Sequence, residues 1–254
     1  MTGFGYNING FGAGGVNTAE LETQSLINGQ SNYNTVIASQ FVGNGGTLII
    51  PVGFWVFSTG FAITVDVNNL TIENYGKIVG KTRGISISGS GCVINNYSGA
   101  FIAGGGGNGQ QGRNGHVGQG AGSSNPLTYL NQAGPNGNSG IGGGAGGGGA
   151  AVSFAGGLTG GQGGWILPGS GGAGGSSGYG TAGAGGSAGN VGGNGSRGGN
   201  DAAGPLNAAG GGGGWGAYGG NSGMGGTGAV GSPAIFPFSN PYTLNNSGTI
   251  YGST

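Results

Sequence analysis

Residues 72–80 read IENYGKIVG, and residues 244–252 read LNNSGTIYG. Both stretches fit one frame, apolar-x-N-x-G-x-I-x-G, and residues 94–104, INNYSGAFIAG, fit it with an insertion. Asn and Gly at this spacing favour a tight turn, because both residues tolerate the backbone conformations that turns require. A repeated strand–turn unit of this size is typical of a β-solenoid, in which every repeat adds one rung. The three stretches therefore predict a small β-solenoid-like domain.

The positions of the copies suggest how the chain is organised. Ile50, Ile72 and Ile94 are spaced by 22 residues, a plausible rung length, whereas Leu244 follows Ile94 by 150 residues. We expect the intervening sequence to be inserted between rungs and the C-terminal strand to return to the solenoid. The alternative is that the three stretches are unrelated β-turns.

Glycine divides the chain of 254 residues into three parts. It accounts for 76 residues, of which residues 103–231 hold 56, residues 1–102 hold 18 and residues 232–254 hold two. We therefore expect an N-terminal domain over 1–102, a glycine-rich unit over 103–231, and a distal loop with a β rung over 232–254.

Within the glycine-rich unit, glycine recurs at every third position over limited runs. The runs are Gly180 to Gly198, Gly134 to Gly149, Gly109 to Gly118, Gly169 to Gly178 and Gly210 to Gly219. Three residues per turn is the period of the polyproline-II helix, which has no internal hydrogen bonds. Its backbone groups need outside partners, so the runs predict a bundle of polyglycine-II helices that bond one another. Collagen and a flexible linker are the competing interpretations, and the broken phase and only eight prolines argue against collagen.

The N-terminal part predicts short helices followed by strands. Residues 18–27, with Asn17 or Thr18 as the N-cap, and residues 32–41 could each form a helix. Apolar and β-branched runs at 47–50, 62–67 and 85–88 predict strands. The expected fold class is thus mostly β and irregular, with short helices in the solenoid-like domain.

Larger side chains interrupt the glycine runs. A bundle of glycine helices has little room inside, so these side chains must lie at its ends or on its outer faces. Rigid aromatic residues on a stiff scaffold suit a binding surface, and the alternative is that they are hydrophobic caps. The predicted receptor-binding residues are Leu127, Tyr129, Leu130, Trp165, Ile166, Leu167, Leu206, Trp215, Tyr218, Ile235, Phe236 and Phe238.

Composition argues against several functions. Ten residues are charged and the net charge is zero, which disfavours nucleic-acid binding and carboxylate-rich metal sites. His116 is expected to be a solvated loop residue and Cys92 a buried apolar side chain. Lys77, Lys81 and Arg83 predict a solvated basic face near Glu73 rather than an anion site. We expect no catalytic, metal-binding or cofactor-binding residues.

Period-three glycine runs, aromatic loops and N-x-G-x-I-x-G rungs together resemble the long-tail-fibre tip adhesins of T-even-type bacteriophages. The resemblance covers roughly residues 70–254. It implies that the N-terminal domain docks on a trimeric tail-fibre protein, with one copy per tip, and that the glycine motifs form a polyglycine-II sandwich. The loops would bind an outer-membrane protein or surface glycan of a Gram-negative host.

Such a protein belongs to the virion, and the absence of a recognisable secretory signal predicts synthesis in the host cytoplasm. Two other functions fit part of the pattern. An ice-binding protein would need a flat, regular face, which the aromatic insertions interrupt. A tail-fibre assembly chaperone would act during assembly and be absent from the finished particle.

Overall fold

The computed structural model describes residues 17–22, 25–27, 30–58, 60–107, 176–177, 180–181, 197–201, 204–207, 213–221 and 227–254. These residues form β-strands, connecting segments and one short 3-10 helix, η1 (Ala38–Gln40). Most of the strands belong to three sheets, and almost all neighbours in those sheets run parallel. The mostly β fold class is therefore confirmed.

The first sheet has five parallel strands. In spatial order they are β1 (Thr18–Glu20), β5 (Thr47–Ile50), β8 (Thr71–Asn74), β11 (Cys92–Asn96) and β18 (Tyr242–Asn246).

The second sheet has six strands, of which only β2 runs antiparallel to its neighbour. Its order is β19 (Thr249–Tyr251), β12 (Phe101–Gly104), β9 (Lys77–Gly80), β6 (Trp55–Ser58), β3 (Gln30–Asn34) and β2 (Ser25–Ile27).

The third sheet has four parallel strands. Their order is β17 (Ile235–Phe236), β10 (Arg83–Ile87), β7 (Phe61–Val65) and β4 (Val36–Ile37).

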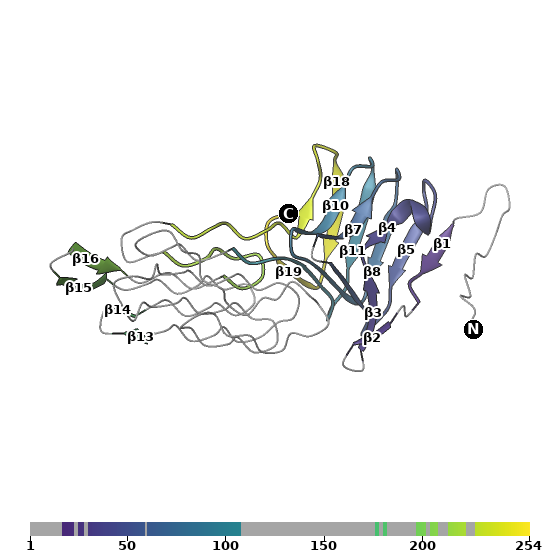
Figure 1. The fold of residues 1–254 in the computed structure, drawn as a ribbon. Coiled ribbons are helices and arrows are strands. Elements are labelled where there is room, and N and C mark those ends of the chain that lie inside the picture. Colours follow the sequence, from purple (N-terminus) through teal and green to yellow (C-terminus); the bar gives the residue numbers. More distant parts are fainter. Residues whose placement is uncertain are drawn as a thin grey trace.

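The chain visits the three sheets in turn, one strand per sheet. It passes from β5 through β6 and β7 to β8, and then repeats the circuit through β9 and β10 to β11 and β12. After β12 the glycine-rich region intervenes, and the circuit resumes with β17, β18 and β19. We call this winding the coil. Figure 1 shows β1 at one end of the coil and β18 toward the other.

Strand register confirms that the C-terminal copy of the repeat returns to the coil. Leu244 lies opposite Ile94, and Asn246 lies opposite Asn96, as β18 pairs with β11. The same rows continue from β11 to β8. One detail of the predicted spacing is wrong, because Leu48 rather than Ile50 lies in register with Ile72.

The two predicted N-terminal helices are also wrong. Residues 18–27 contain β1 and β2, and residues 32–41 contain most of β3, all of β4 and the single turn η1. Asn17 is no N-cap: its carbonyl oxygen accepts the backbone N–H of Thr47 at 2.8 Å, and the N–H of Leu21 donates to Ile49 O at 3.0 Å. Pairing with β5 thus overrides the local helix preference.

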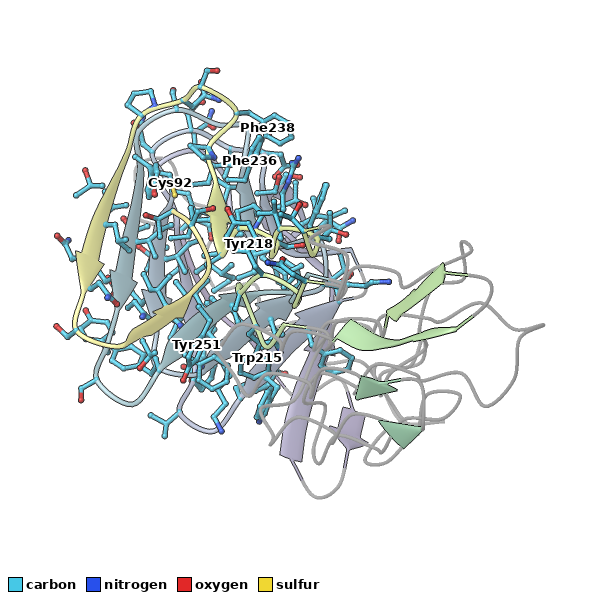
Figure 2. All side chains as sticks on the ribbon, turned by 90° about the vertical axis from the view of Figure 1, so that its left-hand side faces the viewer. Cys92, Trp215, Tyr218, Phe236, Phe238 and Tyr251 are labelled. Carbon is cyan, nitrogen blue, oxygen red and sulfur yellow. The ribbon has the colours of Figure 1, made fainter. Side chains whose placement is uncertain are left out.

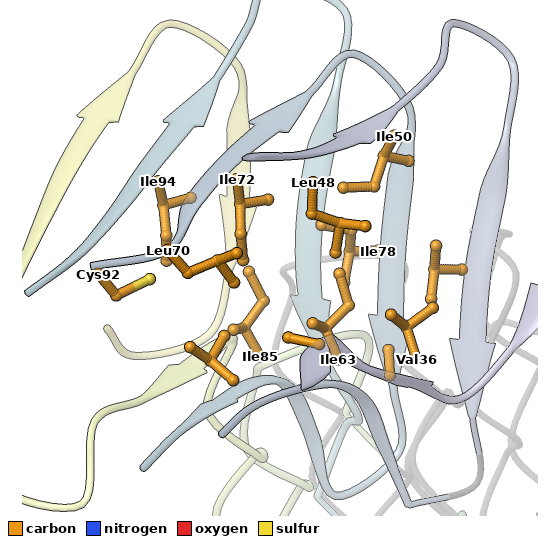
Figure 3. Packing of buried hydrophobic residues seen from close by; sticks show 14 of the residues in the cluster. Val36, Leu48, Ile50, Ile63, Leu70, Ile72, Ile78, Ile85, Cys92 and Ile94 are labelled. Atoms are coloured by element: carbon orange, nitrogen blue, oxygen red, sulfur yellow. The ribbon is translucent and has the colours of Figure 1, made fainter. Parts of the chain in front are cut away.

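Apolar rows fill the inside of the coil. Leu48, Ile72 and Ile94 are fully buried and follow one another across the first sheet (Figure 3). Val36, Ile63, Ile85 and Ile235 form the corresponding row of the third sheet. Cys92 lies in the same cluster as a free, buried thiol, and burial raises its pKa to about 12. The prediction of an apolar role for this cysteine is confirmed.

A row of asparagines lies at the corner between the first and second sheets, with Asn74 and Asn96 buried and Asn246 exposed. Asn74 Nδ2 donates to Asn96 Oδ1 at 2.7 Å, and Asn96 Nδ2 donates to Asn246 Oδ1 at 2.7 Å. Asn74 Oδ1 also accepts the backbone N–H of Gly76, which holds the turn. We call this row the asparagine ladder.

Three glycine-rich segments lie side by side where the coil ends. The N–H groups of Gly213 and Gly216 donate to Gly107 O and Gly104 O, at 2.8 and 3.0 Å, and that of Gly219 donates to Ala229 O at 2.9 Å. Every third residue of this segment therefore bonds a neighbouring segment. Segments 213–221 and 227–233 run away from the coil on the side opposite β1 (Figure 1).

The remainder of the predicted polyglycine-II bundle falls largely outside the described residues. The pieces described there are two antiparallel pairs: β13 (Ser176–Ser177) with β14 (Gly180–Thr181), and β15 (Arg197–Asp201) with β16 (Gly204–Asn207).

Replacing Asn96 by Ala should lower the free energy of unfolding by about 2 kcal/mol, because it leaves the buried amide of Asn74 without its Asn96 partner. The matched control is Asn245→Ala, which removes an exposed amide hydrogen bond to Asn95 and should cost less than about 0.5 kcal/mol. Urea unfolding followed by circular dichroism measures both. Equal losses would contradict a special role for the ladder.

Gly106→Ala should disrupt the packing of the glycine segments. A Cβ at Gly106 would overlap the carbonyl oxygens of Gly213 and Gly214, whereas a Cβ at Gly43 would meet nothing within 4 Å. We expect Gly106→Ala to cost about 2 kcal/mol and Gly43→Ala to be neutral or slightly stabilising. Hydrogen exchange of the Gly213 amide reads the effect locally, and unchanged protection in Gly106→Ala would refute it.

Candidate binding surface

Half of the predicted receptor-binding residues lie outside the described residues, and they remain predictions. These are Leu127, Tyr129, Leu130, Trp165, Ile166 and Leu167. His116 lies outside them as well. Leu206 falls on β16, where the structure gives its place in a strand pair.

Trp215 and Ile235 are buried, so their prediction as receptor contacts does not fit the structure. Trp215 is 1% exposed and packs with Trp55 and Phe57 in a second hydrophobic cluster. Its ring centroid lies 5.1 Å from that of Phe101 and 5.6 Å from that of Tyr251, its labelled neighbour in Figure 2. Aromatic pairs at these distances stabilise a fold by burial, and Trp215 thereby fixes its glycine segment to the coil.

Ile235 completes an interior row of the coil. It is 1% exposed and lies opposite Ile85 in the third sheet. The sequence predicts it as a contact because large side chains beside glycine runs have little room inside a bundle of glycine helices. The pairing of β17 with β10 turns it inward instead.

Tyr218, Phe236 and Phe238 remain accessible. Tyr218 is 54% exposed and Phe238 is 50% exposed, whereas Phe236 is half-buried. The rings of Phe236 and Phe238 meet edge to face, with centroids 4.7 Å apart (Figure 2). These three residues are the part of the predicted set that the described surface presents.

Arg83 contacts this aromatic group, and the sequence analysis did not predict that contact. Its guanidinium carbon lies 3.8 Å from the ring centroid of Phe236, 4.6 Å from that of Phe238 and 4.9 Å from that of Phe61. Phe61 lies opposite Arg83 in the pairing of β7 with β10. The alignment of successive repeats could have predicted this contact, because it places Arg83 opposite Phe61.

The predicted basic face is not formed. Lys77 belongs to β9 of the second sheet, with its Nζ 4.4 Å from the ring centroid of Trp55, whereas Arg83 belongs to the third sheet. Glu73 belongs to the first sheet and accepts hydrogen bonds from Asn95 Nδ2 at 2.9 Å and Tyr97 Oη at 2.6 Å. Charged residues that are close in sequence therefore lie on different sheets of the coil.

A stacked tyrosine pair lies at the corner beside the asparagine ladder. The rings of Tyr75 and Tyr97 are parallel to within 1°, with centroids 4.2 Å apart. The hydrogen bond from Tyr97 to the Glu73 carboxylate raises the pKa of this phenol, because the bond is made by the protonated form.

The described residues offer little reactive chemistry. They contain no group of three or more His, Cys, Asp or Glu side chains placed to bind a metal ion. Nor does any helix formed by them have the length and apolar character needed to cross a membrane. What these residues present is a set of exposed and half-buried aromatic rings on the coil and on the adjoining glycine-rich segment.

Comparison with known proteins gives one similar structure. No protein-family model and no curated protein matches the sequence. The fold is similar to that of a chain in the crystal structure of the gp37-gp38 adhesin tip complex of the bacteriophage S16 long tail fiber. The match covers 94% of this chain and 82% of that chain, with 17% identity and a TM-score of 0.45. A likeness of this degree identifies no binding residue.

Trp215→Ala should lower the free energy of unfolding by about 3–5 kcal/mol, as expected for removal of a buried aromatic side chain. Tyr218→Ala changes a half-exposed aromatic three residues away and should cost less than about 0.5 kcal/mol. Urea unfolding of the two variants provides the comparison. A stable Trp215→Ala protein would restore Trp215 as a candidate contact.

Proposed function

We propose that this chain is the receptor-recognising adhesin at the tip of a bacteriophage tail fibre. In this proposal the β1 end of the coil joins the fibre, while the β17 end of the coil and the glycine-rich region face the bacterial surface. The protein is a binding protein of the virion, made in the host cytoplasm, and it catalyses no reaction.

The observation that carries the proposal is the way the insertion leaves and re-enters the coil. It starts after β12 of the second sheet and ends before β17 of the third, and its two limbs are joined by backbone hydrogen bonds. Ser232 N–H donates to Gly105 O at 2.7 Å, next to the bonds of Gly213 and Gly216. A long insertion clamped at its base suits a projection that presents a distal surface.

Glycine spacing at the base agrees with a polyglycine-II arrangement of the projection in its period only. The donors at Gly213, Gly216 and Gly219 follow the period of three that the sequence repeats in its other runs, while a turn with Gly216 at φ +61° interrupts this segment. A Cβ at Gly106, Gly107 or Gly228 would overlap a neighbouring backbone, so close approach is what demands glycine there. We extend this packing to the period-three runs as part of the proposal.

The two ends of the coil suit two partners. The limbs of the insertion run from the side opposite β1, so the β1 end is the surface that we assign to a trimeric tail-fibre protein. The proposed division into residues 1–102, 103–231 and 232–254 then has a simple interpretation. The first and third parts build one attachment coil, and the middle part is the projection.

The proposed receptor contacts are aromatic and apolar residues, with an outer-membrane protein or surface glycan as their target. Stiff glycine segments would hold the side chains in place before contact and so reduce the ordering cost of binding. The proposed set is Leu127, Tyr129, Leu130, Trp165, Ile166, Leu167, Leu206, Tyr218, Phe236 and Phe238.

The test is competition for adsorption. Purified full-length protein, mixed with Gram-negative host cells, should slow adsorption of the phage that carries this chain. Tyr218→Ala should raise the half-blocking concentration by about thirtyfold if Tyr218 is a central contact, as for removal of a hot-spot residue worth about 2 kcal/mol. The matched control, Asn245→Ala, changes an exposed residue of the coil and should block like the parent protein.

Two further measurements separate the competing functions. Mass spectrometry of purified virions should find the chain, whereas an assembly chaperone would be absent. Thermal hysteresis should be undetectable, and a clear positive result would favour an ice-binding function. If the protein neither slows adsorption nor occurs in virions, the proposal is wrong.

A further inference from the structure

Arg83 is held between aromatic rings on the outside of the third sheet. Phe61 comes from β7, Arg83 from β10, and Phe236 from β17, which follows the long insertion. Ser86 lies opposite Phe236, is 2% exposed, and accepts a hydrogen bond from Arg83 Nη1 at 3.4 Å. Residues of three neighbouring strands thus surround the guanidinium of this arginine.

Phe238 closes the group from the connection between β17 and β18. Its φ is +36° and that of Ser239 is +73°, in the left-handed region that side chains of this size rarely adopt. Asn240 Nδ2 donates to Ser88 O at 2.9 Å and ties the connection to the chain just after β10. The connection therefore holds a half-exposed phenyl ring over a charged group, at the cost of backbone strain.

Three phenyl rings lie within 5 Å of the guanidinium carbon of Arg83. Arginine stacks on aromatic rings through its planar face, while its N–H donors point outward in that plane. Within the described part of the chain, Nη1 to Ser86 is the hydrogen bond of the Arg83 side chain, and no carboxylate lies within ion-pair distance of it. Among the described residues, one of the five N–H donors of the guanidinium therefore has a partner, through a long hydrogen bond.

We propose that Arg83, Phe61, Phe236 and Phe238 form a binding site for an oxyanion, a carboxylate or a phosphate, that lies beside an apolar group of the same ligand. The guanidinium edge matches the two oxygens of such a group. The exposed part of Phe238 supplies the apolar contact next to it. Stacking keeps the arginine oriented before the ligand arrives, so little rotamer entropy is lost on binding.

This site deepens the proposed function, and its physiological ligand rests on that function: an anionic group displayed on the bacterial surface. The chemistry of the site stands apart from it and can be tested with small probes. Phenyl phosphate and phenylacetate carry the two oxyanions beside an aromatic ring, and benzyl alcohol is the neutral counterpart.

The experiment is a titration of the full-length protein with each probe, followed by NMR of the Arg83 side-chain Nε–H and the Phe238 amide. Both resonances should shift with at least one anionic probe, and benzyl alcohol should bind at least tenfold more weakly. The stronger of the two anions identifies the preferred oxyanion. Equal binding of benzyl alcohol, or no shift with either anion, would overturn the proposal.

Variants assign the effect to the site. Arg83→Gln should weaken binding of the anion at least tenfold, and Arg83→Lys should recover only part of it, since lysine lacks the planar fork. Phe238→Ala, at an exposed position, should weaken binding even if Arg83 variants fold poorly. The matched control is Lys77→Gln, which removes the cation stacked on Trp55 in the second sheet and should bind as the parent does. An equal loss in this control would refute the assignment.

The two proposals fail in different ways. If the probes bind and Arg83→Gln blocks adsorption as well as the parent does, the site exists but is no receptor contact. If adsorption is blocked by the parent protein and no anionic probe binds, the adhesin function stands and the oxyanion site is wrong.

Discussion

Register between parallel strands is the constraint on which the remainder of this structure depends. The asparagine ladder fixes it, because Asn74, Asn96 and Asn246 bond one another in successive turns of the coil, and Asn74 and Asn96 are buried. A buried amide without a partner is costly, and a slip by one residue would turn the apolar rows outward. The same register brings Phe236 beside Ser86 and so creates the environment of Arg83.

The sequence revealed those parts of the fold that repeat. The N-x-G-x-I-x-G frame located the return of Leu244 beside Ile94, across 150 residues, because strands that share a turn motif also share a register. It misplaced Ile50, whose apolar side chain occupies the row of Asn74. Residues 18–27 looked helical because their local preferences do not include the edge of β5, with which β1 pairs.

The binding surface was harder to predict, since burial of an aromatic residue depends on distant partners. Trp215 and Tyr218 are three residues apart in a glycine-rich segment, yet one packs against Phe101 and the other faces solvent. The sequence predicted that Arg83 and Lys77 share a basic face, but Lys77 lies in the second sheet and Arg83 in the third. Proximity in sequence is a poor guide here, because each turn of the coil sends neighbouring segments to different sides.

The placement of the insertion has a consequence for biogenesis. The circuit of the coil that follows the insertion uses β17, β18 and β19, which are synthesised after the whole glycine-rich region. The entropic cost of closing this loop grows only with the logarithm of its length. The time that passes before β17, β18 and β19 are synthesised therefore matters more than the number of residues that separate them from β12. Until then β10, β11 and β12 are the open rim of a partly built coil, where a nascent chain is most exposed to pairing with another copy. The strands that complete the coil are therefore the ones that follow the insertion.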